Sequence, residues 1–123
     1  MRLEKVRIQN LRCIEDTDEF NIADVTCLVG KNESGKTTVL QGLYKLNPDN
    51  KAAANFDPLD DYPRHRYSNY KAKHAKETDP VLTTTWKLDH VDVECLSKEI
   101  GEGARRIDSV QIHKGYYNLL RVF

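Results

Sequence analysis

The sequence has no excess of charge of either sign. Its 123 residues include 19 lysines and arginines and 19 aspartates and glutamates. Because no overall basic field attracts nucleic acid, any such binding has to come from a local patch. No apolar run approaches the roughly 20 residues needed to cross a bilayer. The charged, alternating N-terminus is not typical of a signal peptide. These features predict a soluble cytoplasmic protein that does not contact a membrane.

Cysteine is scarce, and no metal-binding spacing occurs. The three cysteines, Cys13, Cys27 and Cys95, are far apart and form no CxxC pair. Such thiols are typical of a reducing compartment, where they remain free. The four histidines form no HxH or HExxH pattern, so a metal site built from them is not expected.

The remaining composition is that of one globular domain covering residues 1–123. Residues 1–48 predict an antiparallel hairpin (strands 2–10 and 13–22, with a bulge as an open alternative), a strand over 25–29 buried on both faces, and a helix over 36–46. Residues 49–80 are rich in proline and charge and predict a loop-rich excursion with at most one short helix. Residues 81–123 predict a strand over 81–89, a helix over about 91–100 that packs Val93, Leu96 and Ile100 inward and ends at Gly101, and two strands that turn at Lys114–Gly115.

The stretch "GKNESGKT", residues 30–37, matches the phosphate-binding pattern G-x-x-x-x-G-K-[ST] at every fixed position. Its glycines allow a tight turn whose backbone N–H groups point inward, and the following helix adds its positive end. Lys36 then reaches the β- and γ-phosphates of a nucleotide, and the Thr37 hydroxyl ligates Mg²⁺. The residues predicted to hold the nucleotide are Gly30, Lys31, Asn32, Glu33, Ser34, Gly35, Lys36, Thr37 and Thr38. Glu33 either faces solvent or serves as a general base, and its place within the phosphate loop favours solvent.

Residues 1–48 resemble the N-terminal lobe of ABC-type ATPase heads. That branch includes RecF, the SMC-type repair ATPases, and the OLD-family nucleases with their Gabija-type relatives. The resemblance rests on Asn10-Leu11-Arg12 after the first strand, on "GKNESGKT", on "LQGLYKLNP" after it, and on "DYPR" at residues 61–64. It is strongest to the AAA-type ATP-binding domain of OLD-like proteins.

The resemblance implies an α/β fold, namely a P-loop NTPase lobe with an N-terminal antiparallel hairpin and further antiparallel strands. It also implies ATP and Mg²⁺ as ligands, a role in DNA repair or anti-phage defence, and a second copy or a nuclease as partner. Arg12 would lie near the nucleotide, with an ordinary surface arginine as the alternative.

Other family motifs are missing from these residues. No strand of four apolar residues ends in Asp-Glu, and no LSGG-like signature is present. The sequence therefore predicts the N-terminal part of an incomplete ATPase head that binds ATP without evident means to hydrolyse it. Two alternatives stay open: a non-hydrolysing regulatory module, and a nucleic-acid-binding module. The latter would use the basic stretch at 64–76, where Arg64, Arg66, Tyr67 and Tyr70 stand together; that stretch could equally be a solvated face.

Overall fold

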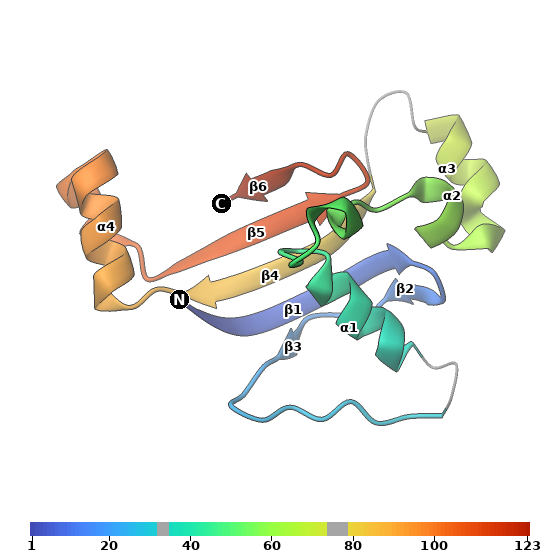
Figure 1. Ribbon diagram of the computed structural model, residues 1–123, viewed down its shortest axis with the longest axis horizontal. Coiled ribbons are helices and arrows are strands. Elements are labelled where there is room, and N and C mark those ends of the chain that lie inside the picture. Colours follow the sequence, from blue (N-terminus) through green and yellow to red (C-terminus); the bar gives the residue numbers. More distant parts are fainter. Residues whose placement is uncertain (32–34, 74–78) are drawn as a thin grey trace.

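A computed structural model describes residues 1–31, 35–73 and 79–123 and shows a mixed α/β fold. Its strands form one antiparallel sheet in the order β2-β1-β4-β5-β6, and β3 also pairs with β1 (Figure 1). The strands are β1 (Arg2–Leu11), β2 (Ile14–Asp16), β3 (Phe20–Asn21), β4 (Pro80–Lys87), β5 (Ser109–Gly115) and β6 (Leu120–Val122). None of the helices in the described part of the chain combines the length and apolar content needed to span a bilayer.

The predicted N-terminal hairpin is confirmed, and its second strand is interrupted. β2 and β3 both pair with β1, and between them Thr17 exchanges hydrogen bonds with the backbone of Ile8. Asp18 follows with a φ of 55°. At the turn from β1 to β2, Asn10 and Arg12 also have positive φ, 52° and 53°. These residues with left-handed backbone conformation make a sharp turn, and the turn places Arg12 and Cys13 beside the helix that follows the glycine loop.

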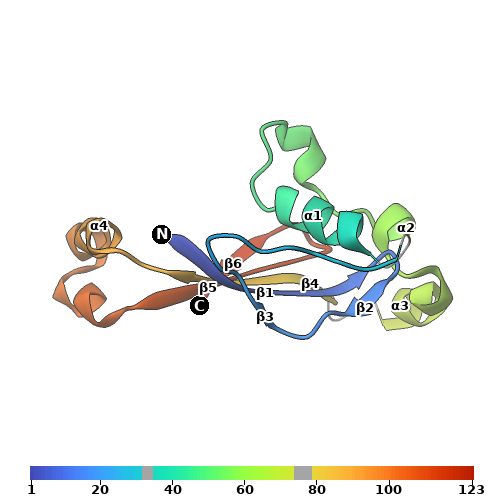
Figure 2. The same cartoon turned by 90° about the horizontal axis from the view of Figure 1, so that it is seen from below.

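Helix α1 (Lys36–Tyr44) lies across one face of the sheet, as Figure 2 shows. It forms where predicted and ends two residues earlier. Gly42 permits close contact, because a Cβ atom there would lie 3.1 Å from a methyl of Leu11 on β1. The side chains enclosed at this part of the sheet are Val6, Ile8, Leu82 and Val39.

Residues 49–80 contain more helix than the sequence predicts. They form η1 (Lys51–Ala54), α2 (Pro58–Asp61), η2 (Arg64–Arg66) and α3 (Tyr67–Lys73). Each is about one or two turns long, too short for a periodic pattern to develop, and two begin at Asn50 and Asp57 side-chain caps. The excursion is anchored by an aromatic cluster of Phe56, Tyr62, Tyr70 and Tyr116, whose closest ring centroids are 4.3 Å apart.

The predicted buried strand over 25–29 is wrong. This segment runs along the border of the sheet beyond β3, and none of the described strands pairs with it (Figure 1). Val25 is 82% exposed and Val29 is 89% exposed. The apolar, β-branched pattern indicates a local preference for extended backbone. A strand also needs a neighbouring strand to pair with, and none of the described strands pairs with this segment.

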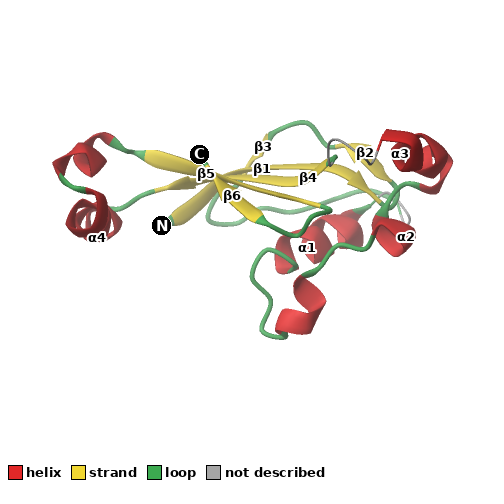
Figure 3. Cartoon of the chain, turned by 90° about the horizontal axis from the view of Figure 1, so that it is seen from above, coloured by secondary structure: helices red, strands yellow, loops and turns green. Residues whose placement is uncertain are grey.

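The second correction concerns α4 (His90–Ile100), which stands with η3 (Glu102–Arg106) at the end of the sheet away from α2 and α3 (Figure 3). Its bounds are those expected, because Asp89 forms a capping box and Gly101 ends the helix with a φ of 89°. Its packing differs, since no α4 residue is buried and Ile100 is 64% exposed. The two final strands are confirmed, but β5 continues through Gly115 and the turn lies at 116–119.

Candidate functional site

Lys36 closes the glycine loop in this structure. Its Nζ donates a hydrogen bond to the carbonyl of Gly30, 2.5 Å away, across the width of the loop. Gly35 precedes the helix with a φ of 94°, a conformation that favours glycine. Asn32, Glu33 and Ser34, which the sequence also assigns to the site, lie outside the described residues. This contact brings Lys36 to Gly30, the two described ends of the loop.

The turn between β1 and β2 packs directly against this loop. A Cβ atom at Gly35 would lie 3.0 Å from Cγ1 of Ile14 and 3.3 Å from Sγ of Cys13. The Cys13 thiol is also 3.8 Å from the Oγ1 atom of Thr38. Sequence reasoning missed Cys13 and Ile14 as site residues, and the only signal was their place directly after Arg12.

The first turn of α1 offers unpaired donors to an anion. The structure records no side-chain cap for this helix among the described residues, and its first turn, Lys36–Val39, contains no acid. The first N–H groups of a helix have no partner within it, so they and the helix dipole favour a bound phosphate. Thr37 is exposed, and its hydroxyl oxygen suits a hard cation such as Mg²⁺. Thr38 is only 8% exposed and faces Cys13 instead.

An open groove of about 640 Å³ runs beside the loop. It lies between the β1–β2 turn, the extended segment 26–29 and the start of α1. Its walls are partly apolar, from Ile14, Phe20, Leu28 and Val39, with Lys36 at one side. The two acids in its lining are already paired: Asp16 accepts from Arg7, 2.6 Å away, and Glu15 lies 2.7 Å from His65.

Arg12, the remaining predicted site residue, lies beside α1. Its Nε donates to the Asp61 carboxylate at 3.2 Å, and its Nη1 donates to the side-chain oxygen of Gln41. Asp61 is nearly inaccessible and also accepts from Lys45 at 3.0 Å. Burial alone would raise the pKa of this carboxyl, but the Asp57 amide, Lys45 and Arg12 together hold the pKa below its usual value. Arg12 is thus held in place beside α1. Sequence reasoning did not identify Asp61 as a site residue and quoted it only as part of "DYPR".

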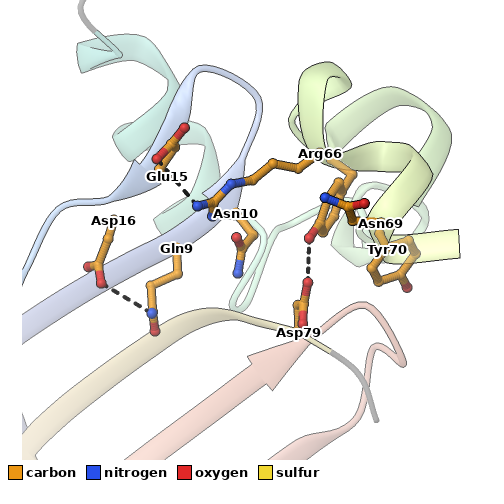
Figure 4. Close-up of a pocket in the computed structure, with 9 residues that line it drawn as sticks. Gln9, Asn10, Glu15, Asp16, Arg66, Asn69, Tyr70 and Asp79 are labelled. Carbon is orange, nitrogen blue, oxygen red and sulfur yellow. Dashed lines mark hydrogen bonds and ion pairs between the residues drawn. The ribbon is translucent and has the colours of Figure 1, made fainter. Parts of the chain in front are cut away.

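The basic stretch 64–76 is partly used inside the fold. Tyr70 is 3% exposed within the aromatic cluster, so its ring face is not open to stack on a base. His65 and Arg66 both face Glu15, and Figure 4 shows Arg66 reaching across a polar cavity of about 470 Å³ toward it. On the far side of that cavity Asp79 accepts from Tyr62. Arg64 and Lys71 stay exposed, whereas His74 and Lys76 lie outside the described residues.

Comparison with protein families decides the class of the chain. The model of the AAA ATPase domain family matches residues 1–106. The chain belongs to that family. The matched part of this AAA ATPase domain includes the glycine loop, Arg12 and Asp61, and it confirms the P-loop ATPase resemblance and indicates ATP binding.

Among curated proteins, this AAA ATPase domain is similar to the uncharacterized protein MJECL44 of Methanocaldococcus jannaschii. The two are 35% identical over 60 residues, which make up 49% of this chain and 18% of the relative. The chain therefore aligns with less than a fifth of that relative's length. No solved structure matches the chain.

Proposed function

We propose that the chain binds ATP with Mg²⁺ through residues 30–38, as the N-terminal part of an ATPase that processes DNA. The observation that carries this proposal is the closure of the loop by Lys36 on Gly30, with left-handed Gly35 starting α1. The family assignment supports the nucleotide. The DNA-processing role, in repair or anti-phage defence, rests on the resemblance to OLD-like proteins.

Each residue has a defined part in holding the ligand. Lys36 exchanges the Gly30 carbonyl for phosphate oxygens, which as anions are stronger partners for an ammonium group. The first N–H groups of α1 donate to the phosphates, and Gly35 supplies the left-handed turn from which the helix begins. Bound Mg²⁺ would neutralise phosphate charge, and the exposed Thr37 hydroxyl is the residue that fits it. Arg12, fixed beside α1, adds a second positive charge at the flank of the site.

Hydrolysis would need groups beyond those that hold the nucleotide. The attacking water needs a group that orients it and a further acid on the metal side. Neither group can be assigned here, because Glu33, the candidate base, lies outside the described residues. The second candidate function, a nucleotide-binding module without turnover, is favoured by the sequence, in which no strand of four apolar residues ends in Asp-Glu and no LSGG-like signature occurs.

Calorimetry with Mg²⁺-ATP tests the nucleotide proposal. Lys36→Ala is expected to weaken binding by at least about tenfold, because a charge-assisted contact to phosphate is lost. Lys98→Ala, on the remote helix α4, removes the same charge and is expected to change Kd by less than about twofold. Equal affinity of the Lys36→Ala variant and the unmodified chain would reject ATP binding at this loop. Phosphate release above background that disappears in Thr37→Ala would instead reject the non-hydrolysing alternative.

The DNA role needs its own measurement. DNA binding followed over a salt series should show affinity that falls as salt rises, because phosphate contacts release counterions. Arg64→Ala is the variant to compare, since Arg64 is exposed and outside the Glu15 contacts. Absence of binding at low salt would remove a direct DNA contact by this part of the protein. We also propose a second copy of the chain or a nuclease as partner, on the basis of the same resemblance to OLD-like proteins.

A further inference from the structure

Asp61 is a buried carboxylate that joins three separate parts of the chain. Its side chain is 3% exposed, and all of its recorded partners are donors. Oδ1 accepts from Arg12 Nε at 3.2 Å, whereas Oδ2 accepts from Lys45 Nζ and from the backbone N–H of Asp57, each at 3.0 Å. The β1–β2 turn, the end of α1 and helix α2 therefore meet at one residue.

The link to Arg12 has two points of attachment. The backbone carbonyl of Asp61 accepts from the backbone N–H of Arg12, and the carboxylate accepts from the Arg12 side chain. Arg12 itself has a φ of 53°, so the carbonyl contact also helps to hold a conformation that arginine rarely adopts. Both the main chain and the side chain of Arg12 are thus set by one residue.

The guanidinium is held on two edges and open on the third. Asp61 takes Nε and Gln41 on α1 takes Nη1, whereas Nη2 has no hydrogen-bond partner among the described residues. The Arg12 side chain is 44% exposed. An arginine held in this way presents a donor with little remaining freedom, so little entropy is lost when an anion binds.

Lys45 connects the same carboxylate to the other end of α1. Lys45 caps the C-terminus of this helix, and its Nζ also donates to the Asn55 carbonyl at 2.7 Å. Asp61 therefore fixes α1 near its middle, through Arg12 and Gln41, and at its end, through Lys45. One carboxylate opposes two cations, so the cluster keeps a net positive charge beside the helix that starts at the glycine loop.

We propose that Asp61 is a positioning residue of the nucleotide site and acts through Arg12, holding its guanidinium beside α1 so that the open edge meets the bound nucleotide. This inference rests on the proposed function, ATP binding at residues 30–38. Asp61 does not touch the ligand; it sets where the arginine stands.

A double-mutant cycle on Mg²⁺-ATP binding, measured by calorimetry on the full chain, tests this role. Asp61→Asn keeps the shape of the side chain and is expected to weaken ATP binding about tenfold, the size of one lost charge-assisted contact. In the Arg12→Ala background the same substitution is expected to change Kd by less than about twofold, because the residue it positions is gone. Asp60→Asn, an exposed neighbour with the same charge change, should leave Kd within about twofold.

The outcomes distinguish ATP binding at residues 30–38 from the positioning role of Asp61. Equal binding by Lys36→Ala and the unmodified chain would reject the proposed function. Loss of binding in Lys36→Ala, together with the same weakening by Asp61→Asn in both backgrounds, would leave the proposed function standing and reject the positioning role. Tighter binding by Asp61→Asn would also reject it, because Asp61 would then compete with the nucleotide for Arg12.

A spectroscopic measurement covers the case in which Asp61→Asn does not fold. In the unmodified chain the Arg12 Nε–H signal is expected to be resolved, in slow exchange with water, and to shift when Mg²⁺-ATP is added. Addition of Mg²⁺-ATP to Lys36→Ala should leave the signal in place. An Arg12 signal averaged with those of exposed arginines would overturn the proposal without any change at Asp61.

Discussion

The Sγ atom of Cys13 lies 3.8 Å from the Oγ1 atom of Thr38, although 25 residues separate the two in the chain. The contact places an exposed thiol at the first turn of α1 and against Gly35. Cys13 is therefore a reporter for the nucleotide site. Cys95 on α4 provides a comparison within the same molecule, whereas Cys27 lines the same groove as Cys13.

ATP is expected to protect Cys13 from alkylation. At a free concentration about ten times Kd, the rate should fall about tenfold if the bound nucleotide covers the thiol. Mass spectrometry of the alkylated peptides gives the rate for each cysteine separately. Cys95 on the remote helix α4 should react at the same rate with and without ATP. At the same ATP concentration, Lys36→Ala should reduce the protection of Cys13 to about twofold or less. Unchanged Cys13 labelling at saturating ATP would place the nucleotide elsewhere.

The conformation of Gly35 predicts a loss of stability on substitution. Gly35→Ala puts a Cβ atom at a φ of 94° and 3.0 Å from Ile14, so we expect the free energy of unfolding to fall by about 1–3 kcal/mol. Gly103→Ala is the matched control, since nothing lies within 4 Å of its added Cβ and its φ is not in the left-handed range. That variant should stay within about 0.5 kcal/mol of the unmodified chain in urea unfolding. Equal stability of the two variants would show that the loop adopts another conformation at Gly35.

Local pattern sufficed to predict the helix that follows the glycine loop. The spacing of Val39 and Leu43 and the stop before Pro48 depend on neighbouring residues, and α1 appears where they indicate. The contact of Arg12 with Asp61 could not be predicted in the same way, because 49 residues separate them. Only the folded excursion, anchored by its buried tyrosines, brings "DYPR" to the β1–β2 turn.

The strand expected over 25–29 shows that local β propensity alone does not produce a paired strand. Its sequence has the β-branched, apolar character of a buried strand, yet in the described chain it lacks a partner edge. The helix over 90–100 also shows that local pattern does not determine packing. Its capping residues predicted its bounds correctly, but none of its apolar residues is buried.

Hydrogen exchange measures the state of residues 25–29 directly. Since the structure pairs this segment with none of the described strands, its amides are expected to exchange at rates close to those of an open chain. Amides of β4, which pairs with strands on both sides, should be among the slowest to exchange. Protection at 25–29 equal to that of β4 would mean that the segment is paired in solution and that the original strand prediction was correct.

Tyr116 is expected to make the protein less stable in alkali. Burial raises the pKa of its phenol, with nearby Asp61 and Tyr62 adding to the effect, and burial raises the pKa of Tyr62 and Tyr70 in the same direction. Below the ordinary tyrosine pKa of about 10 both states keep the proton, so the phenols do not change stability with pH. Above it the unfolded chain loses protons that the folded chain retains. The free energy of unfolding should then fall by up to about 1.4 kcal/mol per pH unit for each tyrosine.

Urea unfolding of Tyr116→Phe from about pH 7 to about pH 11 isolates this contribution. The variant loses the hydrogen bond to the Asn10 carbonyl, so it should be about 1 kcal/mol less stable near neutral pH. Above pH about 10 its free energy of unfolding should fall less steeply with pH than that of the unmodified chain, because one of the buried phenols is gone. Phe56→Leu is the control, because Phe56 packs against Tyr116 and does not titrate. This variant should lower the free energy of unfolding by the same amount at every pH. An unchanged alkaline slope in Tyr116→Phe would mean that this phenol titrates equally in the folded and unfolded chain, and that it is not enclosed by the aromatic cluster in solution.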